Sequence, residues 1–186
     1  MILRLFQSGS DQRSIRDLYG MIVAQARTAA FYDGYGVPDT LEGRFDLIVL
    51  HLVLVLDRLG RVNGVARGFG QKLFDVFCHD LDDNLREMGV GDLAVPKRMR
   101  GFAEAFYGRQ AAYLAAFAAA DEQELEKALT RNIFQRADID QGAVRLARYA
   151  RAVLRQFETQ DDSALLLGKI VFPKPEAIAH DGKEIR

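Results

Sequence analysis

The pattern of apolar positions is dominated by the stretch from Phe45 to Leu59, FDLIVLHLVLVLDRL. From Leu47 to Leu56 every residue is apolar except His51. This run is shorter than the roughly 20 apolar residues that a membrane-spanning helix needs. A helix that is apolar all round is normally buried in a globular core. The β-branched residues of the run would also suit a central strand, so periodicity alone leaves both structures open.

The residues before this run indicate a helix. Asp39 follows Pro38 and can accept a hydrogen bond from an exposed backbone N–H, while Glu42, three residues later, can reach back to the cap. Gly60 supplies a stop signal. We therefore predict a central apolar helix over about 39–59, with the other helices packed around it.

Apolar residues at spacings of three and four predict five further helices. We place them at about 11–31, 65–88, 93–120, 121–132 and 140–158, with one last turn at 164–168. Asp11 or Ser14 is the expected cap of the first of these helices, and Asp121 and Asp140 are the expected caps of the last two. Residues 1–10 are expected to form a frayed start.

No pair of strands joined by a hairpin turn is evident. The fold class is therefore all-α, a single-domain bundle of about six helices around the central apolar helix. We expect the helical domain to cover residues 1–168. Pro173, Pro175 and scattered charges predict an extended or partly disordered tail over 169–186.

Composition bears on the kind of partner and on the cellular location of the protein. The chain has 186 residues, with a formal net charge of −1, so bulk charge does not predict a DNA partner. Cys78 is the only cysteine, which rules out an intramolecular disulfide and favours a reducing compartment. Residues 1–7 lack the apolar region and cleavage site of a signal peptide. We therefore expect a cytoplasmic protein.

The histidines offer little chemistry. His51 lies in the middle of the apolar run, where we expect it to be buried and neutral, because charging it there without a partner would cost several kcal/mol. Asp75, His79 and Asp82 recur at i, i+4 and i+7, which could present metal ligands on one helix face or form a solvated polar stripe. His79-Asp80 is similar to the pair used by metal-dependent phosphohydrolases, but their further histidines have no counterparts here.

No catalytic residue, metal site or cofactor is predicted. The chain contains no Walker loop, dinucleotide fingerprint or zinc-ligand spacing. Cys78 lies between Phe77 and His79 on a predicted helix, where a packing thiol is the ordinary reading. His180 falls in the predicted tail.

Four arginines share one side of the helix predicted at 140–158. They are Arg145, Arg148, Arg151 and Arg155, at spacings of three, three and four. We call them the arginine strip. One interpretation is a solvated face whose aliphatic stems cover apolar surface. The other is a docking strip for phosphate, as in ribosomal RNA or an anionic membrane surface.

A second charged surface lies on the helix predicted at 65–88. It contains Asp82, Asp83, Arg86 and Glu87. Pairs of Arg86 with Asp82 or Asp83 would be local helix contacts, each contributing only about 0.2–0.5 kcal/mol. The alternative is a charged patch that recognises a partner.

Three stretches resemble the ubiquinol–cytochrome c chaperone family, whose mitochondrial members assist assembly of the cytochrome bc1 complex. They are residues 25–46 (QARTAAFYDGYGVPDTLEGRFD), 74–92 (FDVFCHDLDDNLREMGVGD) and 97–113 (KRMRGFAEAFYGRQAAY). The segments YDGYGVPDT, LREMGVGD and FYGR occur in the order expected of the family. The resemblance is specific because it rests on this combination.

The resemblance implies a non-enzymatic assembly chaperone that binds newly made cytochrome b. Mitochondrial relatives work with a small partner protein and associate with the ribosomal exit region. This chain lacks their N-terminal targeting extension, which implies a bacterial-type member and leaves both associations open. A peripheral position at the inner membrane fits such a client. A metal-dependent helical hydrolase and a purely scaffolding helical domain remain the alternatives.

The matching motifs also imply candidate partner-binding residues. These are Tyr32, Asp39, Arg44, Asp46, Asp82, Asp83, Arg86, Glu87, Tyr107 and Arg109. Some of them have a structural alternative. Asp39 could serve as a helix cap, and Arg44 and Asp46 could form an ion pair beside the core.

Overall fold

The computed structural model describes residues 2–62 and 66–178, except for the side chains of 2–11 and 66–67. It is built of helices, and the described part of the chain contains no strand. The elements are α1 (Ile2–Ala26), α2 (Ala30–Asp33), α3 (Leu41–Arg61), α4 (Ala66–Glu87), α5 (Val95–Ala118), α6 (Gln123–Leu129), the π-helical turn η1 (Thr130–Phe134), α7 (Gln141–Glu158), α8 (Asp162–Leu166) and the 3₁₀ turn η2 (Pro175–Ala177). The all-α, single-domain prediction is confirmed.

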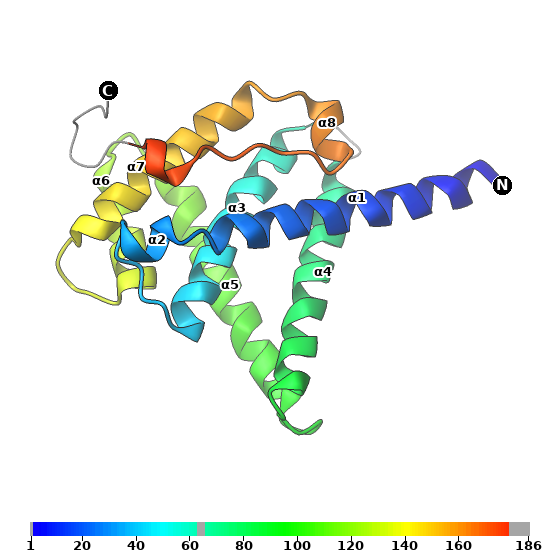
Figure 1. Cartoon of the computed structure of the whole chain (residues 1–186), viewed down its shortest axis with the longest axis horizontal. Coiled ribbons are helices and arrows are strands. Elements are labelled where there is room, and N and C mark those ends of the chain that lie inside the picture. The colour runs from blue at the N-terminus through cyan, green and yellow to red at the C-terminus, as the bar shows by residue number, and fades with distance from the viewer. Residues whose placement is uncertain (1, 63–65, 179–186) are drawn as a thin grey trace.

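Helix α3 is the centre of the bundle, as its sequence predicts. It contacts α1, α4, α5, α7 and η1, and Figure 1 shows it enclosed between these elements. All its residues from Leu47 to Val55 are buried except Ile48, which is half-buried. Each fully buried leucine or valine stabilises the fold by about 1.5–3 kcal/mol, so this helix supplies much of the core.

The ends of two predicted helices differ from the sequence expectation. Thr40, not Asp39, caps α3: its backbone is extended and its hydroxyl accepts from the Gly43 N–H at 3.1 Å. The prediction of Asp39 as the cap was therefore wrong by one residue. Helix α1 begins at Ile2 rather than at Asp11 or Ser14 and stops at Ala26, before the separate short helix α2.

Helices α4 and α5 run antiparallel and form an arm that projects from the bundle (Figure 1). Gly89, with a φ of +79°, ends α4 in the left-handed conformation that glycine tolerates best. Rings from both helices hold the arm together, with centroids 4.7 Å apart for Phe74 and Phe106 and 5.8 Å apart for Phe77 and Phe106. Phe69, Leu73, Phe77 and Leu85 are buried and form the inward face of α4.

The two predicted aspartate caps in the second half of the chain are confirmed. Asp121 accepts from the Gln123 N–H at 2.9 Å, at the start of α6. Asp140 accepts from the Gly142 N–H at 2.7 Å, at the start of α7. The helix predicted to end at 132 instead continues through the π-helical turn η1 to Phe134.

The segment after α8 runs extended beside α1 and across α7 (Figure 1). Over residues 169–178 it packs on the core. Ile170 and Pro175 are buried, and the Tyr35 hydroxyl donates to the Pro175 carbonyl at 2.8 Å. The Phe172 ring lies 5.4 Å from His51. Residues 179–186, including His180, lie outside the described part of the chain.

Candidate functional site

A groove of about 250 Å³ lies between the end of α3 and the facing sides of α4 and α5. Its lining residues carry no formal charge, and most of them are apolar or glycine. They are Leu56, Leu59, Gly60, Gly70, Gln71, Phe74, Phe106, Tyr107 and Gln110. Such a surface suits an apolar ligand.

Two glycines open this groove. A Cβ atom at Gly60 would meet nothing within 4 Å, and one at Gly70 would meet only a Leu56 methyl at 3.4 Å. Glycines on facing helices allow a third backbone to approach closely. Tyr107 forms part of the wall and is 56% exposed, with its ring 5.7 Å from Phe74 and 5.5 Å from Phe106. It presents an apolar ring and a polar hydroxyl to whatever enters.

A buried ion pair fixes the wall that carries Tyr107. Arg109 Nε lies 2.8 Å from Oδ1 of Asp46, whose side chain is 1% exposed. Burial raises the pKa of Asp46 to about 6, although the Arg109 guanidinium opposes that shift. Arg109 also lies over the Phe45 ring, 5.8 Å from its centroid. The pair therefore ties α5 to α3, two residues from Tyr107.

Three other candidate residues gather before and at the start of α3. Arg44 Nε lies 2.7 Å from Asp39 Oδ1, and both side chains are exposed. The Arg44 guanidinium holds the pKa of Asp39 below its ordinary value. The Tyr32 hydroxyl donates to the Ala26 carbonyl at 3.1 Å. The alternative of an Arg44–Asp46 ion pair was wrong, because each residue has a different partner.

Comparison with known proteins identifies this architecture. The family described as "Ubiquinol-cytochrome C chaperone" matches residues 33–172.

The chain belongs to this family.

A solved structure also matches this chain. It is the crystal structure of the Cbp3 homolog from Brucella abortus, which is 37% identical in sequence. The match covers 96% of this chain and 100% of the other, with a TM-score of 0.85. A comparison with curated proteins gave no match. The resemblance seen in the sequence is thereby confirmed.

The remaining candidate residues of this chaperone lie towards the far end of α4. Arg86 bridges two carboxylates, with Nε 2.5 Å from Asp82 and Nη1 2.5 Å from Asp92. The alternative of a local Asp82–Arg86 pair is confirmed, and Asp92 takes the place proposed for Asp83. Asp83 and Glu87 are exposed. This cluster lies beside the connection between α4 and α5, whereas the Asp46–Arg109 pair joins α3 to α5.

The arginine strip is less uniform than the helical wheel suggests. Arg148 and Arg155 are exposed, whereas Arg145 and Arg151 are half-buried. Arg151 Nη2 donates to the Glu122 carbonyl at 3.1 Å, just before α6. Two of the four arginines therefore take part in packing, and two face solvent.

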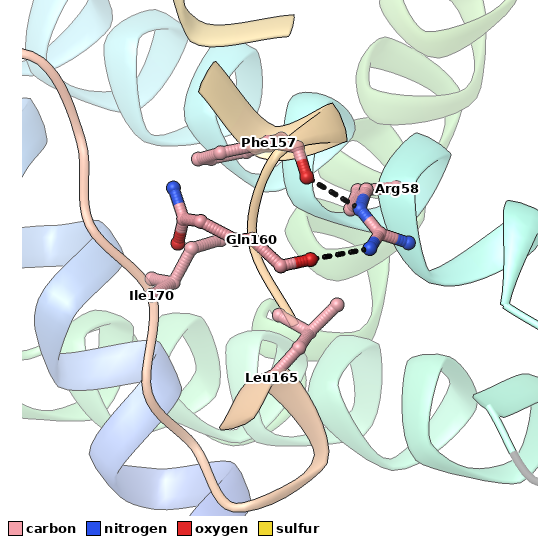
Figure 2. Close-up of a pocket in the computed structure, with 5 residues that line it drawn as sticks. All are labelled: Arg58, Phe157, Gln160, Leu165 and Ile170. Atoms are coloured by element: carbon pink, nitrogen blue, oxygen red, sulfur yellow. Dashed lines mark hydrogen bonds between the residues drawn. The ribbon is translucent and has the colours of Figure 1, made fainter. Parts of the chain in front are cut away.

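A hollow beside Arg58 is already filled by the protein itself. Figure 2 shows Arg58 reaching across it to Phe157 and Gln160, with Leu165 and Ile170 closing the other sides. Arg58 Nε donates to the Phe157 carbonyl at 2.8 Å, and Nη2 donates to the Gln160 carbonyl at 3.0 Å. No space for a water-sized molecule remains. Arg58 therefore caps the carboxyl end of α7, where a cation is favoured.

The two described histidines, His51 and His79, lie in different surroundings. His51 is buried as predicted, and burial lowers its pKa to about 4. His79 is exposed, and Asp75 accepts from Gln71 on the same helix.

Within residues 2–62 and 66–178, no three His, Cys, Asp or Glu side chains lie close enough together to hold a metal ion. In the same ranges, none of the helices combines the length and the apolar character needed to cross a bilayer.

The groove was missed from the sequence. Gly60 was interpreted as a helix stop signal, yet it lies inside α3, and both it and Gly70 of α4 line the groove. Of the residues predicted from the motifs, only Tyr107 lines the groove. Two helical glycines near a long apolar helix, with an exposed tyrosine in a motif, were the available signal.

Proposed function

We propose that this chaperone binds newly made cytochrome b and holds an apolar helical segment of it in the groove between α3, α4 and α5. The observation that carries this proposal is the uncharged, glycine-opened groove beside Tyr107, in a protein that belongs to the ubiquinol-cytochrome C chaperone family. Binding of this client would assist biogenesis of the ubiquinol–cytochrome c reductase (bc1) complex.

The chemistry of the client supports this assignment. An integral membrane protein has helices that are apolar all round, and such a surface is unfavourable in water. The half-buried Phe74 and the exposed Tyr107 offer rings for it to pack on, and Gly60 and Gly70 leave room for its backbone. The work is done by binding alone, so the proposal assigns no catalytic residue, metal or cofactor.

The charged candidate residues are proposed to act around this groove rather than in it. The exposed pair Asp39–Arg44 with Tyr32 forms one partner-facing surface. The cluster of Asp82, Asp83, Arg86 and Glu87 forms a second, for the client or a small partner protein. Asp46 and Arg109 are proposed to support the groove from inside.

The arginine strip is proposed to dock on phosphate, from the ribosome or from anionic lipid at the inner membrane, through its exposed members Arg148 and Arg155. Arginine suits phosphate because its planar fork can donate two hydrogen bonds at once. Under this proposal the chaperone works in the cytoplasm, close to the site where its client is inserted.

Site-specific crosslinking tests the groove assignment. A photoreactive residue in place of Tyr107, activated briefly in growing cells, is expected to yield an adduct with cytochrome b. The same photoreactive residue in place of Gly20 is the control, because Gly20 is exposed on α1 and a Cβ there meets nothing within 4 Å. No adduct at position 107, or equal adducts at both positions, would overturn the proposal.

A further inference from the structure

The extended segment over residues 170–175 is attached to the helices in an unusual way. We call this segment the strap; it runs beside α1 and across α7 (Figure 1). Within the described part of the chain, no backbone–backbone hydrogen bond joins the strap to a helix. The hydrogen bonds that hold its main chain to the bundle come from side chains instead.

Three of these hydrogen bonds meet at the backbone of Val171. The side-chain amide of Gln160 accepts from the Val171 N–H at 2.9 Å and donates to the Val171 carbonyl at 2.8 Å, as a neighbouring strand would. Gln156 donates to the same carbonyl at 3.0 Å. Figure 2 shows Gln160 beside the segment that carries Ile170. The Val171 side chain is 62% exposed, so these contacts recognise the main chain at this position.

Two further donors continue the pattern along the strap. Gln25 donates to the Pro173 carbonyl at 3.2 Å, and the Tyr35 hydroxyl donates to the Pro175 carbonyl at 2.8 Å. Contacts within the bundle also orient both donors. Gln25 donates to the Tyr149 hydroxyl at 2.9 Å, and Tyr35 is 1% exposed. Donors that are already oriented lower the cost of binding a main chain.

Apolar contacts alternate with these hydrogen bonds. Ile170 is buried, and the half-buried Phe172 has its ring 5.3 Å from Phe157 and 5.4 Å from His51. Alternate residues of an extended chain point to the same side, so these two side chains face the bundle while Val171 faces solvent. Main-chain hydrogen bonds combined with pockets for alternate side chains are a common way of binding an extended peptide.

We propose that the surface under the strap is a binding site for an extended apolar peptide, and that the strap leaves when such a peptide binds. We call this surface, with Gln25, Tyr35, Gln156, Phe157 and Gln160, the strap site. The ligand is an unfolded stretch of another polypeptide rather than a helix, because the main-chain groups of a helix already bond to one another. This inference does not rest on the groove between α3, α4 and α5.

The contacts of the strap make its departure inexpensive. The three hydrogen bonds at Val171 lie at the exposed surface, where water replaces them at little cost. Since the strap shares no backbone hydrogen bond with a helix, it can leave without unwinding one. An incoming peptide with apolar side chains two residues apart recovers both the hydrogen bonds and the apolar contacts.

A labelled peptide tests the strap site in the whole protein. The probe has the sequence of residues 168–177, GKIVFPKPEA, and fluorescence anisotropy measures its binding. In the full-length variant Ile170→Asp/Phe172→Asp the chain's own strap no longer seats. The peptide is expected to bind this variant at least about tenfold more tightly than the natural chain, in which the tethered strap competes. A peptide with the same two substitutions is the control and is expected not to bind.

A third substitution identifies the site that the peptide occupies. Adding Gln160→Ala to the released variant is expected to weaken binding of the natural peptide about fivefold, because two hydrogen bonds to its main chain are lost. Unchanged affinity would show that the peptide binds elsewhere and would overturn the proposal.

Tryptophan fluorescence tests displacement without releasing the strap beforehand. The natural chain contains no tryptophan, so Phe172→Trp gives a single reporter on the strap. A large excess of the unlabelled natural peptide is expected to shift its emission to longer wavelength, because the indole moves into water. The control peptide is expected to leave the emission unchanged. If the natural peptide causes no shift, the strap does not exchange and the proposal fails.

Other outcomes of the peptide experiment also count against the strap site. Far-ultraviolet circular dichroism checks that Ile170→Asp/Phe172→Asp keeps its helices. A loss of helices that the natural peptide does not restore would make the strap an ordinary part of the fold. That result, absence of binding to the folded variant, or equal binding of the two peptides would each overturn the proposal.

Discussion

Arg109 Nε lies 2.8 Å from Oδ1 of Asp46, a carboxylate that is 1% exposed. The two residues come from different stretches of the family motif, and they meet inside the protein rather than on its surface. The motif residues therefore fall into a group that lies inside the protein and a group that is exposed. Asp46 and Arg109 hold α5 against α3, while Tyr107, two residues earlier on α5, lines the groove.

Breaking this pair should destabilise the fold. Arg109→Leu would leave Asp46 buried without a cation, and removing one partner of a buried pair costs about 3 kcal/mol. Urea unfolding followed by circular dichroism at pH 7 measures the change. Arg148→Gln, at an exposed arginine, is the control and should change stability by less than about 0.5 kcal/mol. Equal stability of both variants would show that the pair contributes nothing.

The pH dependence of stability should carry two opposing contributions. The pKa of Asp46 is raised from 3.8 to about 6 in the fold, so the folded state binds the Asp46 proton more tightly than the unfolded state does. The contribution of Asp46 to stability therefore falls as pH rises from about 4 to 6. The pKa of His51 is lowered from 6.5 to about 4, so the unfolded state binds its proton more tightly, and this contribution rises with pH from about 4 to 6.5.

Single substitutions should separate these contributions. In Asp46→Asn the free energy of unfolding should rise from pH 4.5 to 6.5, because only the His51 contribution remains. In His51→Gln it should fall over the same range. Each full contribution is at most about 3 kcal/mol, as a pKa shift of about two units implies. Parallel pH profiles for the two variants would contradict the assignment.

The environment of His51 also fixes its tautomer. Nδ1 lies 2.7 Å from the Leu47 carbonyl, which can only accept, so Nδ1 carries the proton. Nε2, 3.0 Å from the Tyr149 hydroxyl, must then accept from it. Gln25 donates in turn to the Tyr149 oxygen at 2.9 Å. Tyr149→Phe should lower stability by about 1–3 kcal/mol, because it leaves Nε2 buried without a donor. An unfolding midpoint equal to that of the natural chain would contradict this chain of hydrogen bonds.

The close approach at Gly142 gives another stability prediction. A Cβ there would lie 2.3 Å from the Tyr35 carbonyl oxygen and 2.6 Å from the Phe134 ring. Gly142→Ala should therefore destabilise the protein by about 1–3 kcal/mol through overpacking. Gly101→Ala is the control, because a Cβ at Gly101 meets nothing within 4 Å. It should stabilise α5 by about 0.5–1 kcal/mol. Thermal unfolding of both variants checks the contrast.

The sequence predicts what depends on local pattern. The apolar run at Leu47–Leu56 and the caps at Asp121 and Asp140 were predicted correctly, because each depends only on residues close to it in the sequence. The cap of α3 was missed by one residue, because Asp39 and Thr40 are both good caps and only the backbone conformation decides between them. The Asp46–Arg109 pair and the groove depend on how α3, α4 and α5 pack, which no local pattern encodes.

The arginine strip can be tested separately from the groove. Arg148→Gln/Arg155→Gln removes the two exposed charges and should weaken sedimentation with ribosomes or with anionic vesicles at low salt, because each basic residue near an anionic lipid surface contributes roughly 1 kcal/mol. The matched variant Arg145→Gln/Arg151→Gln changes the half-buried pair and should lower stability more than binding. If the exposed double variant associates as the natural chain does, the strip is not a docking face.

The central claim is that the groove serves biogenesis of the bc1 complex, and complementation in a bacterium that respires through this complex tests it most directly. The gene is deleted, and cytochrome b content and ubiquinol–cytochrome c reductase activity are measured after reintroducing the natural chain, Gly60→Leu or Gly20→Leu. Both glycines lie in helices with open space at the Cβ position, so the two substitutions are matched in their effect on helix propensity. The account predicts that deletion lowers both quantities and that the natural chain and Gly20→Leu restore them, whereas Gly60→Leu does not. Normal levels after deletion, or full restoration by Gly60→Leu, would contradict it.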